Sequence, residues 1–355
     1  MLYELACAAD EGLREFAWDV EHGFRAPGAS LCVSWPARDG SEQVARPARA
    51  ETAVDVAERV AAGAPDYAIR PGAVAQALAA SVAAARAWQE PDATDLMLAE
   101  GAFDAALEPL AGRVARLPET EWWREPAGAE QFVTRFFYEA GETREVQTPL
   151  APDPGGTREQ LSRWRADGIE TERRFGEHAE LYPGAPLSGA WWSLPMFTAV
   201  WTTPAPGGSD PAALQLEEDR AGETQALVWH ARAAAGARVL EIAGPEDWAE
   251  LCRRHPFDVT RSRRHVWREA TGRDGRWLLP DWPEVAEEWD AVHLSVAAYL
   301  QTAQRAVPVA DDAATVLAGW GPAATVWLTD ALEIDGEPDE WVYDADPGAW
   351  TRLAR

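Results

Sequence analysis

The stretch that decides the fold class is ARVLEIAGPEDWAELCRRH, residues 237–255. Its first seven residues form a short apolar segment typical of a strand, and the remainder has the amphipathic pattern and acidic first turn of a helix. Further strand signals flank it in ALVWHARA (226–233) and AATVWLTDAL (323–332). Strands that alternate with helices indicate an α/β or α+β architecture rather than a helical bundle.

Helical signals dominate the first 147 residues. A short strand is expected within 29–37. Helices are expected in 51–63, 71–89 and 93–117, the last interrupted at Gly101 and Pro109. TPLAPDPGGTREQ (148–160) combines three prolines and two glycines, which is typical of a boundary. We therefore predict an α+β protein with a mainly helical N-terminal α+β domain (1–147), a linker with a charged bridging helix (148–180) and a mixed-sheet α/β C-terminal domain (181–355).

Residues 285–303 have two interpretations. WPEVAEEWDAVHLS (282–295) fits a helix that runs into a short strand. Apolar residues at helical spacing across 285–303 also fit one long amphipathic helix. Under the second interpretation DAVHLS is one face of a helix, and the site residues proposed there lose most of their support.

The composition bounds the class of protein. The 355 residues include 59 Asp and Glu against 32 Arg and no Lys, which gives a net charge of −27. No apolar run approaches the roughly 18 residues of a membrane span. The N-terminus, MLYELACAADEGLREFAWDV, lacks the basic start and apolar run of a signal peptide. We expect a cytoplasmic protein that is repelled by long nucleic acids and anionic membranes.

Several chemistries are disfavoured by what the sequence lacks. Three scattered cysteines and six dispersed histidines form no CxxC, HxH or HxxxH pattern, so neither a disulfide framework nor a metal site is expected. The chain also has no GxGxxG after a strand, no GxxxxGK(S/T), no GxSxG and no HExxH. These absences argue against a Rossmann dehydrogenase, a P-loop enzyme, an α/β hydrolase and a zinc protease.

Positive charge gathers in residues 253–276, where eight arginines stand against three carboxylates. The candidate ligand-binding residues here are Arg261, Arg263, Arg264, His265 and Trp267. The arginines could donate to a phosphate or pyrophosphate, with the histidine as a further donor and the tryptophan as a stacking plane. Two glycines in TGRDGRW (271–277) suit a loop that approaches a ligand closely. The alternative is a solvated loop whose arginines pair with the abundant carboxylates.

SGAWWSLP (188–195) supplies two further candidates. Trp192 could stack on a flat ring while the Ser193 hydroxyl bonds to the edge of that ring. The alternative is that these tryptophans form a strand and pack in the core, as 13 of the 19 tryptophans follow residue 180.

The candidate catalytic residues are His293, Ser295 and Glu340. His293 and Ser295 alternate in DAVHLS if this is a strand, and a histidine can act near neutral pH. The alternative is a hydrogen-bonded core histidine. Glu340, in EIDGEPDEWVYDADPG (333–348), could stabilise a cationic transition state, although acidic loops are common in this chain.

Residues from about 185 to 330 resemble a group of uncharacterised actinobacterial proteins. The resemblance is carried by SGAWWSLP and by ARVLEIAGPEDWAELCRRHPFDVTRSRRHVWREATGRDG (237–275). It continues through LPDWPEVAEEWDAVHLSVAAYL (279–300) and VLAGWGPAATVWL (316–328). This resemblance implies no particular activity.

More distantly, GAWWS, RVLEIAGPEDWAEL and DAVHLS are similar to elements of the RES-domain NAD-consuming toxins and the wider ADP-ribosyltransferase-like fold. That resemblance implies that Trp192, Ser193 and Ser295 line a nicotinamide-ribose site. The N-terminal Arg-aromatic element of the family has no identifiable counterpart here. Its mid-domain glutamate has only loose counterparts in LEEDRAGETQ (216–225), so the catalytic acid stays unassigned.

Three hypotheses about function follow. An enzyme that cleaves or transfers from NAD or a related nucleotide would hold the phosphates with residues 253–276 and stabilise an oxocarbenium-like transition state. NAD would then be a substrate, and no other cofactor is implied. The second hypothesis is a non-catalytic module that binds a nucleotide or another phosphate. The third is an interaction protein that docks an acidic partner, which needs no pocket with converging polar side chains.

Overall fold

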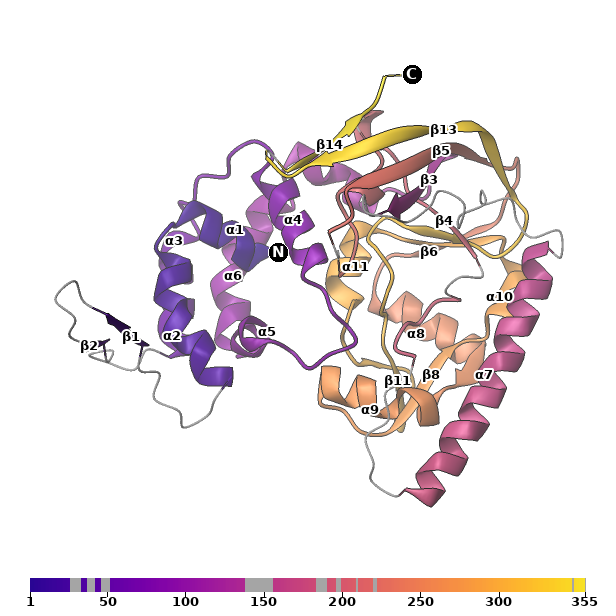
Figure 1. Ribbon diagram of the computed structural model, residues 1–355, viewed down its shortest axis with the longest axis horizontal. Helices are drawn as coiled ribbons and strands as arrows, with labels where there is room; N and C mark the ends of the chain where they lie inside the picture. Colours follow the sequence, from indigo (N-terminus) through magenta and orange to yellow (C-terminus); the bar gives the residue numbers. More distant parts are fainter. Residues whose placement is uncertain are drawn as a thin grey trace. The chain divides into compact units, whose positions relative to one another are not determined.

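The computed structural model describes residues 1–25, 33–36, 42–45, 52–137, 156–182, 190–195, 199–208, 210–219, 222–346 and 348–354. Helices and strands are mixed, so the predicted α+β class is confirmed at this level (Figure 1). Contacts divide the chain into unit 1 (Met1–Ser81 and Glu90–Glu121) and unit 2 (Val82–Gln89 and Trp122–Arg355). The boundary expected near residue 147 lies outside the described residues. Strand β3 (Glu130–Phe137), on its N-terminal side, belongs to unit 2.

Unit 1 is mainly helical, and capping explains where two of its helices begin. The side chain of Thr52 accepts the Asp55 N–H, and that of Asp92 accepts the Asp95 N–H, each in a capping box. The expected break at Gly101 separates two helices, whereas the second of them continues through Pro109. The elements are α1 (Leu2–Ala9), α2 (Leu13–Arg25), the antiparallel pair β1 (Val33–Pro36) and β2 (Glu42–Ala45), α3 (Ala53–Gly63), α4 (Ala73–Ala83), α5 (Ala93–Leu98) and α6 (Ala102–Val114), followed by the 3₁₀ helix η1 (Pro118–Arg124).

The described residues of unit 2 form three four-stranded sheets. The first is antiparallel, in the order β14 (Ala349–Arg352), β13 (Leu332–Asp344), β5 (Gln225–Ala233) and β3. The second has the order β4 (Val200–Thr202), β12 (Thr325–Trp327), β9 (Ala291–Leu294) and β6 (Val239–Ile242), with β6 and β9 parallel. The third has the order β10 (Val307–Pro308), β11 (Ala313–Thr315), β8 (Arg276–Pro280) and β7 (Pro256–Asp258).

Five helices and two short 3₁₀ turns are described in unit 2. They are α7 (Gly156–Leu181), α8 (Pro245–Arg254), α9 (Thr260–Thr271), α10 (Trp282–Glu288) and α11 (Val296–Thr302), with short 3₁₀ turns η3 (Pro206–Gly208) and η4 (Ala212–Leu214). Residues 237–255 form β6 followed by α8, as expected. Residues 285–303 form a helix, a strand and a second helix, because β9 pairs with two strands and the Ser295 side chain caps α11.

The loop expected in TGRDGRW (271–277) is present at residues 272–275. The arginines before it lie on helices, so the solvated loop of the alternative interpretation is wrong for them. Residues 260–271 form helix α9, which Gly272 ends in the left-handed conformation with φ 72°. The start of α9 is capped from α7, where the Glu172 carboxylate accepts the N–H groups of Arg261 (2.8 Å) and Ser262 (3.0 Å). An anion supplied by another helix thus fixes where α9 begins.

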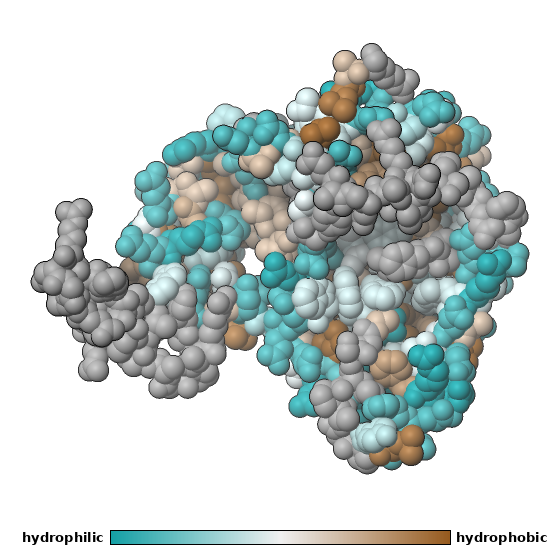
Figure 2. Space-filling view, in the orientation of Figure 1, coloured by the Kyte–Doolittle hydropathy of each residue, from teal (hydrophilic) through white to brown (hydrophobic). Residues whose placement is uncertain are grey.

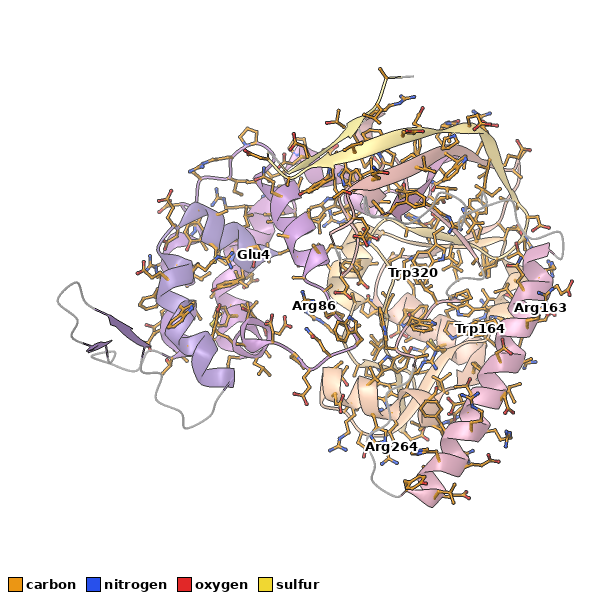
Figure 3. All side chains as sticks on the ribbon, in the orientation of Figure 1. Glu4, Arg86, Arg163, Trp164, Arg264 and Trp320 are labelled. Carbon is orange, nitrogen blue, oxygen red and sulfur yellow. The ribbon has the colours of Figure 1, made fainter. Side chains whose placement is uncertain are left out.

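Tryptophans fill the interior of unit 2. Trp248, Trp282 and Trp320 are fully buried and contact one another through tilted and edge-to-face rings. Figure 3 shows Trp320 inside the unit, among the side chains of several elements. These three tryptophans therefore form part of the core of unit 2.

Helix α7 packs against α9 and α10 within unit 2. Its Trp164 ring contacts Phe257 at 5.6 Å between ring centroids, while Arg163, the preceding residue, points to solvent (Figure 3). A side chain at Gly168 would collide with Phe257, so glycine there allows the close approach. The outer face of α7 is hydrophilic (Figure 2), as its charged sequence predicts.

Candidate functional site

Unit 2 contains a cavity of about 590 Å³. Its walls come from β3, from β4 and the residues on either side of it, from residues 213–219, from Glu223, from Trp191 and from residues 319–324. The lining residues are Phe132, Val133, Thr134, Arg135, Phe136, Trp191, Ala199, Trp201, Thr202, Thr203, Ala213, Leu216, Glu217, Glu218, Asp219, Glu223, Gly319, Gly321 and Ala324. A cavity of this size, with aromatic walls and a few converging polar groups, is the usual form of a small-molecule site.

Glu218 is the chemically distinctive residue of the cavity. Part of its surface faces the cavity, while the surrounding protein desolvates the carboxyl group and raises its pKa to about 7. The Tyr299 hydroxyl donates to Oε1 at 2.7 Å, and the Gly319 N–H also donates to the carboxyl group. Burial raises the pKa of Tyr299 far above its ordinary value, so its hydroxyl keeps its proton. Glu218 can therefore hold a proton near neutral pH and release it.

Three more carboxylates line the cavity: Glu217, Asp219 and Glu223. Asp219 is fixed by Arg86, at 3.3 Å, and by the indole N–H of Trp88, at 2.8 Å. Its backbone has φ 50°, which is rare for a residue other than glycine. The described lining residues include one cation, Arg135, and desolvation lowers the pKa of that guanidinium. The lining therefore favours positive charge over negative charge in a ligand.

Aromatic rings form another part of the lining. They belong to Trp191, Trp201, Phe132 and Phe136. Trp191 approaches Gly319 so closely that a Cβ on this glycine would lie 3.1 Å from Cζ3 of the indole. Gly319 has φ 71°, so glycine there permits both the turn and the contact.

The predicted residues Trp192 and Ser193 lie beside the cavity wall, in a segment without regular structure rather than in a strand. The Ser193 hydroxyl donates to the Ala318 carbonyl, and the Ala318 N–H donates back to that hydroxyl. Arg263 donates to the Trp192 carbonyl at 3.4 Å, and Trp267 donates to the Trp191 carbonyl at 2.8 Å. The structure thus brings Trp192, Ser193, Arg263 and Trp267 together.

The other predicted phosphate ligands lie on or beside the exposed face of α9. Arg264 forms an ion pair with Asp274 at 3.2 Å, near the lower end of unit 2 in Figure 3. The Arg261 guanidinium lies against Gly176 of α7, where a Cβ would collide with it. His265 is half-buried between these arginines and the buried face.

Further arginines of 253–276 also meet partners within the protein. Arg254 pairs with Glu288, Arg276 pairs with Asp258, and the Arg273 guanidinium lies over the Trp277 ring. Arg253 bonds to Glu246, Glu250 and the Val309 carbonyl. Pairing with the abundant carboxylates, the alternative interpretation, therefore describes much of this segment.

The three predicted catalytic residues do not share one cleft with the residues of α9. His293 is buried, with Nδ1 2.8 Å from the Thr325 hydroxyl, and burial lowers its pKa to about 4. Its ring is therefore neutral near pH 7. Ser295 caps α11 and lines a smaller pocket of about 220 Å³, while Glu340 is exposed on β13 opposite Leu227.

The residues that line the cavity carry little signal in the sequence. None of the ten predicted site residues is among its described lining residues, although Trp191 is adjacent to Trp192. The signal for Glu218 was present only as the loose match of LEEDRAGETQ to a family glutamate. Tyr299 appeared in the sequence as one apolar position of a helical pattern, so nothing marked its hydroxyl as a partner of Glu218.

Among the described residues, no group of three or more His, Cys, Asp and Glu side chains is arranged to hold a metal ion. No helix in the described part of the chain has both the length and the apolar character needed to cross a membrane. No protein-family model, no curated protein and no solved structure matches this chain.

Proposed function

We propose that the protein is an enzyme that acts on a small, ring-bearing ligand held in the cavity of unit 2. It would break a glycosidic bond of that ligand and pass the glycosyl group to water or to an acceptor. The observation that carries this proposal is Glu218, a desolvated carboxyl group with a pKa of about 7 that faces an aromatic-lined cavity. A carboxyl group with such a pKa is suited to general acid catalysis near neutral pH.

The roles follow from the chemistry of the reaction. Protonated Glu218 would donate its proton to the leaving group as the glycosidic bond breaks, with Tyr299 and the Gly319 N–H holding the carboxyl group in place. A water molecule, or the hydroxyl group of an acceptor, would form the new bond to the glycosidic carbon and release the proton that restores Glu218. The transition state at a glycosidic carbon carries positive charge, which carboxylates on the cavity wall stabilise. The indole faces of Trp191 and Trp201 offer stacking surfaces for a sugar or a base.

A nucleotide such as NAD is still a candidate ligand under this proposal. Binding of its phosphates by residues 253–276 has less support than binding of its ring in the cavity. The described residues of the cavity include a single arginine, and several arginines of that segment already meet carboxylates. A neutral or cationic N- or O-glycoside is a better electrostatic match. The scarcity of cysteine is consistent with a cytoplasmic setting. A purely protein-docking role leaves the cavity without an explanation.

The test is turnover of a panel of NAD, nucleosides and p-nitrophenyl glycosides, followed by chromatography and absorbance. With Glu218 as the acid, Glu218→Gln should lose about 10²–10⁴-fold in rate. Wild-type activity should fall as pH rises above about 7, where Glu218 loses its proton. Glu340→Gln, at an exposed site on β13, is the matched control and should retain wild-type activity.

Two results would contradict the proposal. Turnover that is equal in Glu218→Gln and wild type would remove Glu218 from the chemistry. Binding of a panel compound in the cavity without any cleavage would favour the non-catalytic binding module.

A further inference from the structure

The three residues 191–193 are held at each backbone carbonyl by a buried side chain. Trp267 holds the carbonyl of residue 191, Arg263 that of 192, and Trp282 that of 193, with its indole N–H at 3.2 Å. Trp267 and Trp282 are fully buried, and Arg263 is 7 % exposed. Three successive carbonyls outside regular structure are thus each bonded to a buried side chain, which fixes the position of residues 191–193.

Burying the Arg263 guanidinium to donate to one carbonyl carries a large desolvation cost. Its Nη1 donates to the Ser262 hydroxyl at 2.7 Å, while Nε has no hydrogen-bond partner among the described residues. Burial lowers the pKa of this guanidinium to about 10, which reflects the loss of hydration. The Glu172 carboxylate attracts this guanidinium, although no ion pair joins the two groups. A buried charge without a directly paired carboxylate usually destabilises a fold relative to an apolar side chain of similar volume. Stability alone therefore does not account for an arginine at this position.

The residues held by α9 connect directly to the candidate site. Ser193 is hydrogen-bonded in both directions to Ala318, and the next residue, Gly319, donates its N–H to the Glu218 carboxyl group. Trp191 lies over Gly319 and lines the cavity. Displacement of residues 191–193 would thus disturb an aromatic wall and a donor to Glu218 together.

We infer that Arg263 and Trp267 are positioning residues for the cavity, which hold residues 191–193 so that Trp191 closes the wall beside Gly319 and Glu218. This inference rests on the proposed function for the meaning of the site, but its geometry is independent of any reaction. It also gives the arginine-rich segment a role different from anion recognition: its one deeply buried arginine faces the protein backbone.

The experiment compares Arg263→Met, Arg263→Lys and Trp267→Phe with wild type and with Arg264→Met as the exposed control. The rate of hydrogen exchange in the peptide that contains residues 190–195 reports how firmly the backbone of residues 191–193 is held. A ¹³C NMR titration of labelled glutamate carboxyls reports Glu218, with Glu218→Gln used to identify its signal. Neither readout requires a substrate.

Arg263→Met should leave the melting temperature unchanged or raise it, because a buried charge is removed. Exchange of residues 190–195 should nevertheless quicken on the order of tenfold in Arg263→Met and Trp267→Phe. The pKa of Glu218 should fall by about one unit as water enters the cavity. Arg263→Lys should restore part of both effects, and Arg264→Met should show neither.

Wild-type exchange and a wild-type Glu218 pKa in both Arg263→Met and Trp267→Phe would overturn the inference. So would a large fall in melting temperature with faster exchange throughout unit 2, since the residues would then act only on stability. An ordinary Glu218 pKa in the wild type would contradict the proposed function instead, and the exchange of residues 190–195 would still decide the role of Arg263.

Discussion

Helix α9 and the cavity segment (residues 213–219 and 222–223) are two charged regions of opposite sign. The basic residues of α9 are conspicuous in the sequence, yet Arg264 pairs with Asp274 only ten residues away, and Arg263 turns into the interior. The cavity segment looks like one more acidic loop, yet it places Glu218 in a desolvated position against Tyr299, 81 residues away. Local charge density thus indicates where pairs form, while the chemically distinctive group arises from burial by distant segments.

The largest effect is expected on the buried side of α9. Trp267→Ala should lower the free energy of unfolding by about 3–5 kcal/mol, because it empties a fully buried site and removes the donor to the Trp191 carbonyl. Urea unfolding followed by tryptophan fluorescence measures this loss. Arg264→Ala, on the exposed side of the same helix, should stay within about 0.5 kcal/mol. Equal losses in the two variants would contradict the contrast between the faces.

A second effect concerns how stability depends on pH. The pKa of Glu218 rises from 4.5 to about 7 on folding, so the native state holds a proton that the unfolded chain has lost between these values. The free energy of unfolding of the wild type should therefore fall by about 3 kcal/mol relative to Glu218→Gln as pH rises from 4.5 to 7. The difference should be constant above that range. Parallel stability curves for the two proteins would show that Glu218 is not desolvated.

A third effect concerns the close contact of Trp191 with Gly319, whose N–H donates to Glu218. Gly319→Ala should cost about 1–3 kcal/mol, because φ is 71° and the new Cβ would lie 3.1 Å from the Trp191 ring. Gly336→Ala is a matched control with φ 58° and no atom within 4 Å of its Cβ, so it reports backbone strain alone. Thermal unfolding of the two variants separates the cost of backbone strain from the cost of the contact with the Trp191 ring. An equal loss in both would mean that the indole contact carries no energy.

The smallest effect is expected for the ion pair between Arg264 and Asp274, on the exposed side of α9. A double-mutant cycle on Arg264 and Asp274, whose side chains are about half exposed, should give a coupling of about 0.2–1 kcal/mol. The coupling should shrink as salt is added, because exposed charges are screened. A larger coupling that is insensitive to salt would place this pair in a desolvated environment, and α9 would then resemble the cavity.

Much of the fold could be predicted because it depends on local patterns. Residues 237–255 form the expected strand and helix, since the period of their apolar residues changes from strand to helix at the glycine–proline pair. Residues 285–303 could not be decided locally. The apolar spacing permits one helix, and only the pairing of β9 with β6 and β12 makes the central residues a strand.

The same division explains the candidate site. The sequence by itself determined such helices as α3 and α8 and the excess of negative charge, because these depend on composition and on residues close together in the chain. It offered the pairing of the arginines with carboxylates only as one of two interpretations. The tertiary structure decided that Arg263 is buried, that His293 is neutral and that Glu218 holds a proton near neutral pH. Each of these properties depends on desolvation, which is set by atoms from elements far apart in the sequence.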